Sequence, residues 1–222
     1  HCRAEPGAGL ARMLWWRERY PDLFGPDQLY AGAGDFLYFM LTGQWRQDAG
    51  NACQEGCYEV AGGRLVAEPL SLVGMTLDQV SPLRQGHATT PLRADTARRL
   101  GLPAGLPVAG PYMDHEAGYL AAAGVLPRPL QVSLGTAWVG NVVFPVDAHW
   151  QSPFQLVLGA PVGQGWLQVQ PLLTGNVTWD WALSTLVGGS RRQTFAKSAA
   201  ILAERLLPPE GLVFLPWMNR PS

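Results

Sequence analysis

Residues 106–124 combine three local patterns that together limit the fold class. "LPVAG" at 106–110 is a short apolar run typical of a strand, and "HEAGYLAAAG" at 115–124 is rich in helix-favouring alanine. The tight loop Pro111-Tyr112-Met113-Asp114 joins them. In α/β proteins a strand, a loop and a helix in this order place the loop at the carboxyl edge of a sheet, where ligands bind. We therefore expect an α/β protein with a ligand site near Asp114.

The chain before this unit is expected to contain helices separated by loops. "GLARMLWWRERYP" has apolar residues at helical spacing and ends in a proline, "GDFLYFMLTG" begins with Asp35 as an expected N-cap, and "TPLRADTARRLG" ends in a glycine. Residues 44–68 are rich in glycine and polar residues, which predicts loops with short strands. Of the adjacent Trp15 and Trp16, one is expected to be buried and the other partly exposed.

The pattern changes after the helix at 115–124. Strand-like runs dominate residues 130–172, and two helices, "NVTWDWALSTLVG" and "RQTFAKSAAILAERLLP", follow before a last strand-like run, "GLVFLPW". Pro127 and Pro129 separate the two patterns. We therefore predict a domain boundary between Gly124 and Leu130.

Composition excludes several classes of protein. Of the 222 residues 47% are hydrophobic and 15% charged, with a formal net charge of −1, so neither disorder nor a nucleic-acid-binding surface is expected. No apolar run is long enough to span a membrane. Three cysteines are too few and odd in number for a disulfide framework, which favours the cytoplasm, and Cys53-x3-Cys57 has no second ligand pair for a metal. Small molecules are the expected partners.

Asp114 is the first candidate for chemistry. Next to the start of a helix, an aspartate satisfies free backbone N–H groups as an N-cap. A carboxylate at a ligand site can also act as a general base and take the proton of a hydroxyl that attacks phosphorus. The two roles are compatible, and the local sequence leaves both open.

The turn in "QVSLGTAWVG" is the second candidate. Gly135 lets a ligand approach the backbone, turn N–H groups can converge on anionic oxygens, and Thr136 adds a hydroxyl donor. Most such turns bind nothing, and no Walker A or GxGxxG motif accompanies this one.

Six segments in order resemble the FGGY family of carbohydrate kinases. They are "RMLWWRERYPDLF", "GDFLYFMLTG", Asp48-Ala-Gly-Asn51-Ala52, "VAGPYMDHEAGYLAAAGV", "VSLGTAWVG" and "LVFLPWMNRPS". Each is weak alone, but together they cover nearly the whole chain at family-like spacing. "LLTGNVTWDWAL" is most similar to xylulokinase-like members.

The resemblance implies an actin-like ATPase fold of ribonuclease-H-like domains flanking a cleft. Residues 1–125 would be the later part of the N-terminal, sugar-binding domain, and residues 126–222 the early part of the C-terminal, ATP-binding domain. The implied reaction transfers the γ-phosphoryl group of ATP, with Mg²⁺, to a hydroxyl of a sugar or polyol, a xylulose-like substrate being favoured. Asp114 falls on the catalytic base, His115 on a substrate-contacting position, and Gly135 and Thr136 on the turn that holds the ATP phosphates. Many relatives are dimers, so a homodimer is also an expectation.

The chain also departs from the family pattern. The N-terminal phosphate loop and the C-terminal adenosine segment have no counterpart here, so we expect an internal piece of a longer protein that is inactive in isolation. "SLGTA" replaces "SLGTS", His115 replaces a smaller amide, "PYM" replaces a glycine run, and Arg220 lacks the family's preceding Gly-Glu. A degenerate member that binds a sugar or a protein partner without turnover is the alternative. An unrelated α/β hydrolase using Asp114 and His115 is a third, against which stands the absence of a GxSxG or metal-ligand pattern.

Overall fold

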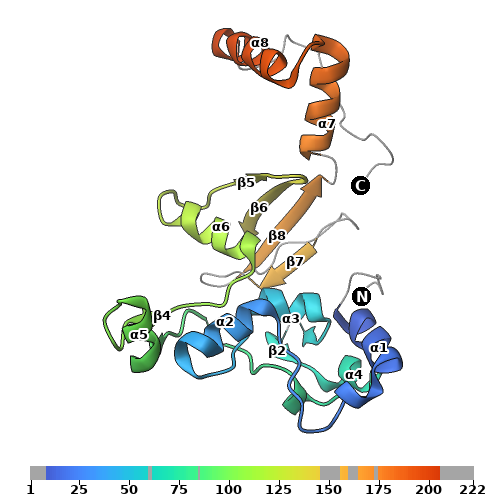
Figure 1. The fold of residues 1–222 in the computed structure, drawn as a ribbon, viewed down its shortest axis with the longest axis vertical. Helices are drawn as coiled ribbons and strands as arrows, with labels where there is room; N and C mark the ends of the chain where they lie inside the picture. Colours follow the sequence, from blue (N-terminus) through green and yellow to red (C-terminus); the bar gives the residue numbers. More distant parts are fainter. Residues whose placement is uncertain are drawn as a thin grey trace.

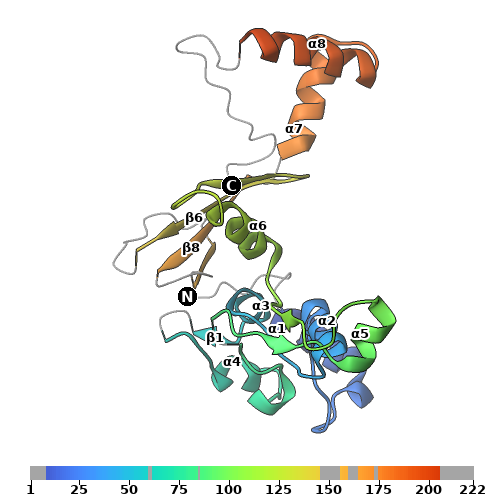
Figure 2. The same cartoon turned by 90° about the vertical axis from the view of Figure 1, so that its left-hand side faces the viewer.

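The computed structural model describes residues 9–59, 62–84, 86–145, 156–159, 165–172 and 175–205. Within these residues the chain forms a mixed α/β structure in three parts, stacked along its long axis (Figures 1 and 2). A helical part with two small ribbons lies at one end, a four-stranded sheet with one helix lies in the middle, and two helices project at the other end. Arg220 and the strand expected at 211–217 lie outside the described residues.

The first part contains five α-helices, two 3-10 turns and two two-stranded antiparallel ribbons. Its helices are α1 Gly9–Arg19, α2 Ala33–Thr42, α3 Ala49–Glu55, α4 Ala67–Ser71 and α5 Ala94–Leu100. The 3-10 turns are η1 Pro21–Leu23 and η2 Leu77–Gln79, and the ribbons pair β1 Tyr58–Glu59 with β2 Arg64–Leu65 and β3 Thr90–Pro91 with β4 Pro107–Val108. The helices predicted around residues 9–21, 34–43 and 90–101 are confirmed.

A hydrophobic cluster holds the early part of this region together. Its buried members are Cys57, Leu70, Val73, Met75 and Val80. Partly buried side chains from α1 and from the segment after it pack against these residues. Deletion of a side chain from such a cluster costs about 2–5 kcal/mol, so this cluster is a main support of the first part.

Three local predictions for this region were wrong. Asp35 is the third residue of α2, where its carboxylate accepts a hydrogen bond from the N–H of the N-cap Gly32 at 3.2 Å, so it caps the helix from inside. The stretch at 44–68 contains the predicted short strands β1 and β2, but the expectation that the rest is loop was wrong, because Asp48 caps the N-terminus of a helix, α3, in this stretch. Trp15 and Trp16 are 56% and 47% exposed, and both contact Tyr20 at the surface.

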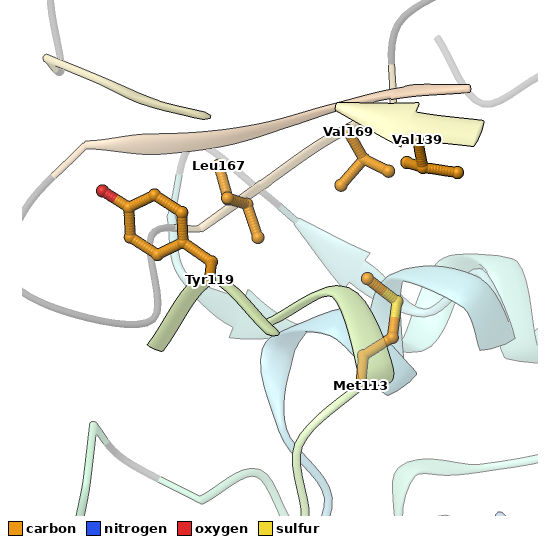
Figure 3. Packing of buried hydrophobic residues seen from close by; sticks show 5 residues of the cluster. All are labelled: Met113, Tyr119, Val139, Leu167 and Val169. Atoms are coloured by element: carbon orange, nitrogen blue, oxygen red, sulfur yellow. The ribbon is translucent and has the colours of Figure 1, made fainter. Parts of the chain in front are cut away.

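The middle part is an antiparallel sheet with helix α6 Asp114–Ala123 against one face (Figure 1). The strand order is β5-β6-β8-β7, and the bounds are β5 Gln131–Leu134, β6 Trp138–Phe144, β7 Leu156–Gly159 and β8 Trp166–Leu172. The strands predicted between 130 and 172 are therefore confirmed where the structure describes them. Met113 and Tyr119 point from the α6 side toward Val139, Leu167 and Val169 of β6 and β8 (Figure 3). This core fixes the start of α6 against the sheet.

The last described part consists of α7 Gly175–Ala182, a short π-helical turn η3 Leu183–Val187 and α8 Arg191–Glu204. It confirms the two helices predicted after the sheet. Helix α7 begins where β8 ends, and Figure 1 shows it leaving the sheet edge near the turn between β5 and β6. Gly175 is buried against Trp138, because a Cβ built on this glycine would lie 2.2 Å from Trp138 Cδ1.

Candidate active site

Asp114 is the first residue of α6 and lies at the surface. Met113 occupies the N-cap position, so Asp114 is not the cap that the local pattern left open. The Asp114 side chain is 88% exposed, and its Oδ1 accepts a hydrogen bond from the N–H of His115 at 2.9 Å. A carboxylate at the first turn of a helix also benefits from the positive end of the helix dipole. The group is therefore ionisable, open and able to accept a further hydrogen bond.

His115 lies between Asp114 and the sheet. Its side chain is 22% exposed, its Nε2 is 4.0 Å from Asp114 Oδ1, and its Nδ1 is 3.4 Å from Nδ2 of Asn141 on β6. Asn141 is fully buried and also donates from Nδ2 to Oε1 of Gln131 on β5. Donation from Asn141 to Nδ1 requires the imidazole to carry its proton on Nε2, on the side of Asp114. His115 therefore connects Asp114 to the sheet.

Two buried acids lie directly behind Asp114, and the sequence interpretation missed both. Asp48 and Glu116 are 3% and 2% exposed, and both accept a hydrogen bond from the N–H of Met113, at 2.8 and 3.3 Å. Burial, and next a hydrogen bond with Asp48, raise the pKa of Glu116 to about 9. Asp48 stands 65 residues before Met113 in the chain, so the contact has no local signal.

Arg84 and Tyr112 flank the same region. The Arg84 guanidinium lies 4.5 Å from the centre of the Tyr112 ring, and the Tyr112 hydroxyl is 2.7 Å from Nδ1 of the exposed His87. Arg84 is 8% exposed, and its Nε and Nη1 have no hydrogen-bond partner within the described part of the chain. The positive charge of Arg84 partly offsets the rise in the pKa of Glu116. Tyr112 is thus held by a stacked cation and a histidine.

Gly135 and Thr136 form the exposed turn between β5 and β6. A Cβ on Gly135 would meet only the carbonyl oxygen of Ala137, at 3.6 Å, so packing within the described chain does not require glycine there. No hydrogen bond between described residues uses the Thr136 hydroxyl; its carbonyl accepts from the N–H of Asn176 at 3.1 Å. The turn is therefore open on its outer side and tied to α7 on its inner side.

Asn176 at the start of α7 is a third residue that the sequence interpretation missed. Its Oδ1 accepts from Nε1 of Trp138 at 2.9 Å, and its Nδ2 donates to the carbonyl of Leu134 at 3.4 Å. With the backbone bond to Thr136, these contacts link Asn176 to β5, to the turn and to β6. The glycine before it, Gly175, was the available signal, because a glycine ahead of a helix marks a close approach of two backbones.

The structure brings Asp114 and His115 together, and no hydrogen bond between described residues joins either of them to the β5–β6 turn. His115 contacts Asn141, which follows Thr136 by five residues on β6. At the rise of an extended strand, five residues span about 16 Å. An extended ligand would be needed to contact both places.

A cavity of about 410 Å³ lies elsewhere, between α7 and α8. Its lining includes Asp180, Trp181, Leu183, Ser184, Gly189, Arg191 and Thr194, and none of the expected site residues. Volume alone is a weak argument for function, whereas open carboxylates and hydroxyls at element ends are chemically specific. We therefore place the candidate site at Asp114, His115 and the β5–β6 turn.

The described residues contain no group of three or more His, Cys, Asp or Glu side chains that could hold a metal ion. A Mg²⁺ ion at this site would therefore depend mainly on oxygens that a ligand supplies. The exposed turn at Gly135–Thr136 fits an anionic ligand, because no described residue bonds to the Thr136 hydroxyl and Gly135 leaves room for close approach.

The family is shown by comparison with known proteins. The model of the FGGY family of carbohydrate kinases, N-terminal domain, matches residues 2–121, which is more than half of the chain. The chain therefore belongs to the FGGY family of carbohydrate kinases. Among curated relatives, an autoinducer-2 kinase of Escherichia coli is 28% identical over 204 residues, covering 90% of this chain and 36% of the relative. An autoinducer-2 kinase of Yersinia enterocolitica is 29% identical over 143 residues, covering 62% of this chain and 26% of the relative.

Solved structures agree with this assignment. Xylulose kinase from Rhodospirillum rubrum matches with a TM-score of 0.80 and 25% identity, covering 96% of this chain and 43% of that one. Plasmodium falciparum glycerol kinase with ADP matches in fold, with a TM-score of 0.67 and 10% identity, covering 87% of this chain and 39% of that one. The mixed α/β fold is thus that of FGGY kinases, which are actin-like ATPases, over part of their length.

The chain spans well under half the length of these relatives. None of its described helices is long and apolar enough to cross a membrane.

Proposed function

We propose that the protein containing this chain is an ATP-dependent carbohydrate kinase in which Asp114 is the general base. The proposal is carried by the exposure of the Asp114 carboxylate. It is 88% exposed at the start of α6, and among the described residues it contacts only the N–H and, at 4.0 Å, the Nε2 of the adjacent His115. Such a group can accept the proton of a ligand hydroxyl without first breaking a tertiary contact. Membership of the FGGY family supports the reaction class.

For phosphoryl transfer the protein mainly has to position the reactants and stabilise charge. A sugar hydroxyl is a poor nucleophile at neutral pH, and phosphoryl transfer depends on alignment and electrostatic stabilisation. Asp114 accepts the hydroxyl proton as the oxygen attacks the γ-phosphorus, which contributes about 10²–10⁴-fold. His115, held by Asn141, presents Nε2–H beside Asp114 and is the proposed contact to a second substrate hydroxyl.

Gly135 and Thr136 are the proposed contacts to the ATP phosphates. The Thr136 hydroxyl and the backbone at Gly135 are exposed, and Asn176 holds the turn from behind. Mg²⁺ bound to ATP would neutralise phosphate charge as it moves to the leaving group.

The proposed acceptor is a sugar or polyol, with a xylulose-like ketose favoured. Support comes from the "TWDWAL" segment and from the likeness to xylulose kinase of Rhodospirillum rubrum at 25% identity. The curated relatives are autoinducer-2 kinases at 28–29% identity, so the autoinducer-2 signal belongs in the same substrate panel. His115 and Tyr112 would set the choice between them, because both depart from the family pattern beside Asp114.

We further propose that residues 1–125 belong to a sugar-binding domain and residues 126–222 to an ATP-binding domain. The family model for the N-terminal domain extends to residue 121 and so ends within α6. Helix α6 also packs on the β5–β8 sheet, so the hydrophobic core around Met113 and Val139 spans the proposed boundary.

A degenerate, sugar-sensing or partner-binding member is the second candidate, and the residue that motivates it is Ala137. It replaces a serine of the family motif beside the proposed phosphate turn. The Ala137 side chain packs against the Met113–Val139 cluster. The substitution therefore exchanges a hydroxyl for a methyl on the core side, while the Thr136 hydroxyl stays exposed. This geometry favours the active kinase over the degenerate member.

The experiment is ADP release from the complete reading frame with Mg·ATP against ketoses, aldoses, polyols and autoinducer-2. We expect at least one acceptor to stimulate ADP release above the acceptor-free rate. Isothermal titration with the same compounds is the companion measurement. Binding of a sugar without stimulated ADP release would replace the kinase with the degenerate member.

A further inference from the structure

The structure holds the backbone immediately before Asp114 by two buried acids. Oδ2 of Asp48 and Oε2 of Glu116 accept from the same Met113 N–H, at 2.8 and 3.3 Å. Oδ1 of Asp48 accepts at the same time from the N–H of Asn51, at 2.8 Å, in the first turn of α3. One carboxylate therefore joins the N-termini of two helices that lie far apart in the sequence.

The space around this contact is closed. A Cβ on Gly50 would lie 2.7 Å from Oε2 of Glu116 and 3.0 Å from Cβ of Met113. Water therefore cannot readily replace either carboxyl group at the Met113 N–H, and a larger residue at position 50 would push the acids apart.

Two acids that share one donor cannot both be charged in such a site. Like charges at hydrogen-bonding distance in a buried place repel strongly, and one of them holds a proton. Burial and a hydrogen bond with Asp48 raise the pKa of Glu116 to about 9, so Glu116 carries the proton at neutral pH. Three further groups face the pair. The Arg84 guanidinium favours the charged form of Glu116, and the Tyr58 phenol has a pKa raised by burial first and then by the charges of Cys53 and Glu116. The buried Asp35 carboxyl has a pKa raised by burial first and further by the charge of Asp48.

We propose that Asp48 and protonated Glu116 form a clamp on the Met113 backbone that positions Asp114 for catalysis. The inference rests on the proposed kinase function, in which Asp114 is the base. Because the Asp114 side chain has no tertiary hydrogen bond in the described chain, its place is set by the backbone that the clamp holds. Both acids are positioning residues, since neither is exposed to a substrate.

The first test compares Glu116→Gln with Glu116→Ala in the complete reading frame. Glutamine keeps a neutral donor toward Asp48 and an acceptor for Met113, so kcat should stay within about threefold of the wild type at pH 7.5. Alanine removes both, and a misplacement near 1 Å lowers kcat about 100-fold while KM for the sugar changes little. Equal loss in the two variants would overturn the clamp.

The second test is the pH profile of kcat. In the wild type, kcat should fall as pH rises through about 9, because ionised Glu116 repels Asp48 and releases Met113. Glu116→Gln cannot ionise and should lack this fall. Glu55→Gln is the matched control, because Glu55 is a partly buried acid with its pKa raised to about 7, and among the described residues the Met113 N–H bonds to Asp48 and Glu116 and not to Glu55. A high-pH fall that Glu116→Gln retains would overturn the proposal.

The third test does not depend on activity. Hydrogen–deuterium exchange of peptides covering residues 110–117 should be about tenfold faster in Glu116→Ala and unchanged in Glu116→Gln. Asp48→Ala should speed exchange in residues 48–54 as well, because Asp48 also caps α3. Unchanged exchange in Glu116→Ala overturns the clamp even in an active enzyme. A wild type without acceptor-stimulated ADP release overturns the kinase while the exchange result still decides the clamp.

Discussion

The two halves of the candidate site are built in opposite ways. The backbone before Asp114 is held by interior contacts. The buried Asp48 and Glu116 accept hydrogen bonds from the Met113 N–H, and the Met113 side chain packs on the sheet. The Gly135–Thr136 turn is open outside and tied to α7 through Asn176. The difference indicates that contacts within this chain fix the position of Asp114, whereas the outer side of the turn gains contacts only when a ligand binds.

Asp114→Asn should have the largest effect. The amide keeps the size of the side chain and can still accept from the His115 N–H, but it cannot take a proton. We expect kcat to fall about 10²–10⁴-fold with the sugar dissociation constant within a few-fold of the wild type. ADP release and calorimetric sugar titration give the two numbers. Loss of sugar binding would show that Asp114 has a structural role, and Asp78→Asn, at an exposed site, is the matched control.

Glu116→Gln should change how the free energy of unfolding depends on pH between about 4.5 and 9. The unfolded chain releases the Glu116 proton near pH 4.5, whereas the folded chain holds it to about pH 9. In that window the wild-type free energy of unfolding therefore falls as pH rises, by roughly 3 kcal/mol between pH 4.5 and 7.

Glutamine does not titrate, so the stability gained by Glu116→Gln relative to the wild type should grow with pH up to about 9 and then level off. Thermal denaturation at pH 5, 7 and 9 measures this difference. Exposed Glu18→Gln is the control. A difference in Tm between Glu116→Gln and the wild type that stays constant across these pH values would contradict the assignment of the proton to Glu116.

Thr136→Val tests the open turn. Valine keeps the shape and removes a hydroxyl that no described residue uses, so Tm should stay within experimental error. A lost hydrogen bond to a charged phosphate should raise KM for ATP about tenfold or more, with the sugar KM unchanged. Steady-state kinetics with each substrate varied separately makes the measurement. An unchanged KM for ATP would remove the turn from the phosphate site.

The smallest predicted effect is that of Asn176→Ala. It removes the acceptor of the Trp138 N–H and the donor to the Leu134 carbonyl, at partly exposed places, and should lower the free energy of unfolding by about 1 kcal/mol. Asn176→Asp, which keeps the acceptor, should lose less. Urea denaturation of both variants tests the order. If the two variants lose equal stability, the Trp138 bond contributes nothing measurable.

The same contrast explains what the sequence could predict. Helix α6, the β5–β6 turn and the strands after residue 130 follow from local patterns, and so do Asp114 and Thr136 as chemically open groups. Glu116 and Asp48 could not be found in this way, because their role depends on hydrogen bonds to the N–H of Met113, which lies 65 residues after Asp48 in the chain. Asp48 also explains why α3 was missed, since its capping role was hidden within a Gly-rich, polar stretch.

The exposure of Trp15 and Trp16 could not be predicted either, because it depends on which face of α1 packs against the first part of the chain. Side chains of that helix such as Leu10 and Met13 pack on the Cys57–Val80 cluster, and the two tryptophans lie on the outer face. The spacing of residues shows which side chains share a face of the helix, but only the neighbouring elements determine which face is buried.

The most direct test of the central claim is the chemical identity of the product. The complete reading frame would be incubated with Mg·ATP and its best acceptor, and the products followed by ³¹P nuclear magnetic resonance. The account predicts ADP together with a new phosphomonoester resonance that requires the acceptor and is lost in Asp114→Asn. ADP and inorganic phosphate without a phosphomonoester would contradict it, because water and not a sugar hydroxyl would then have accepted the phosphoryl group.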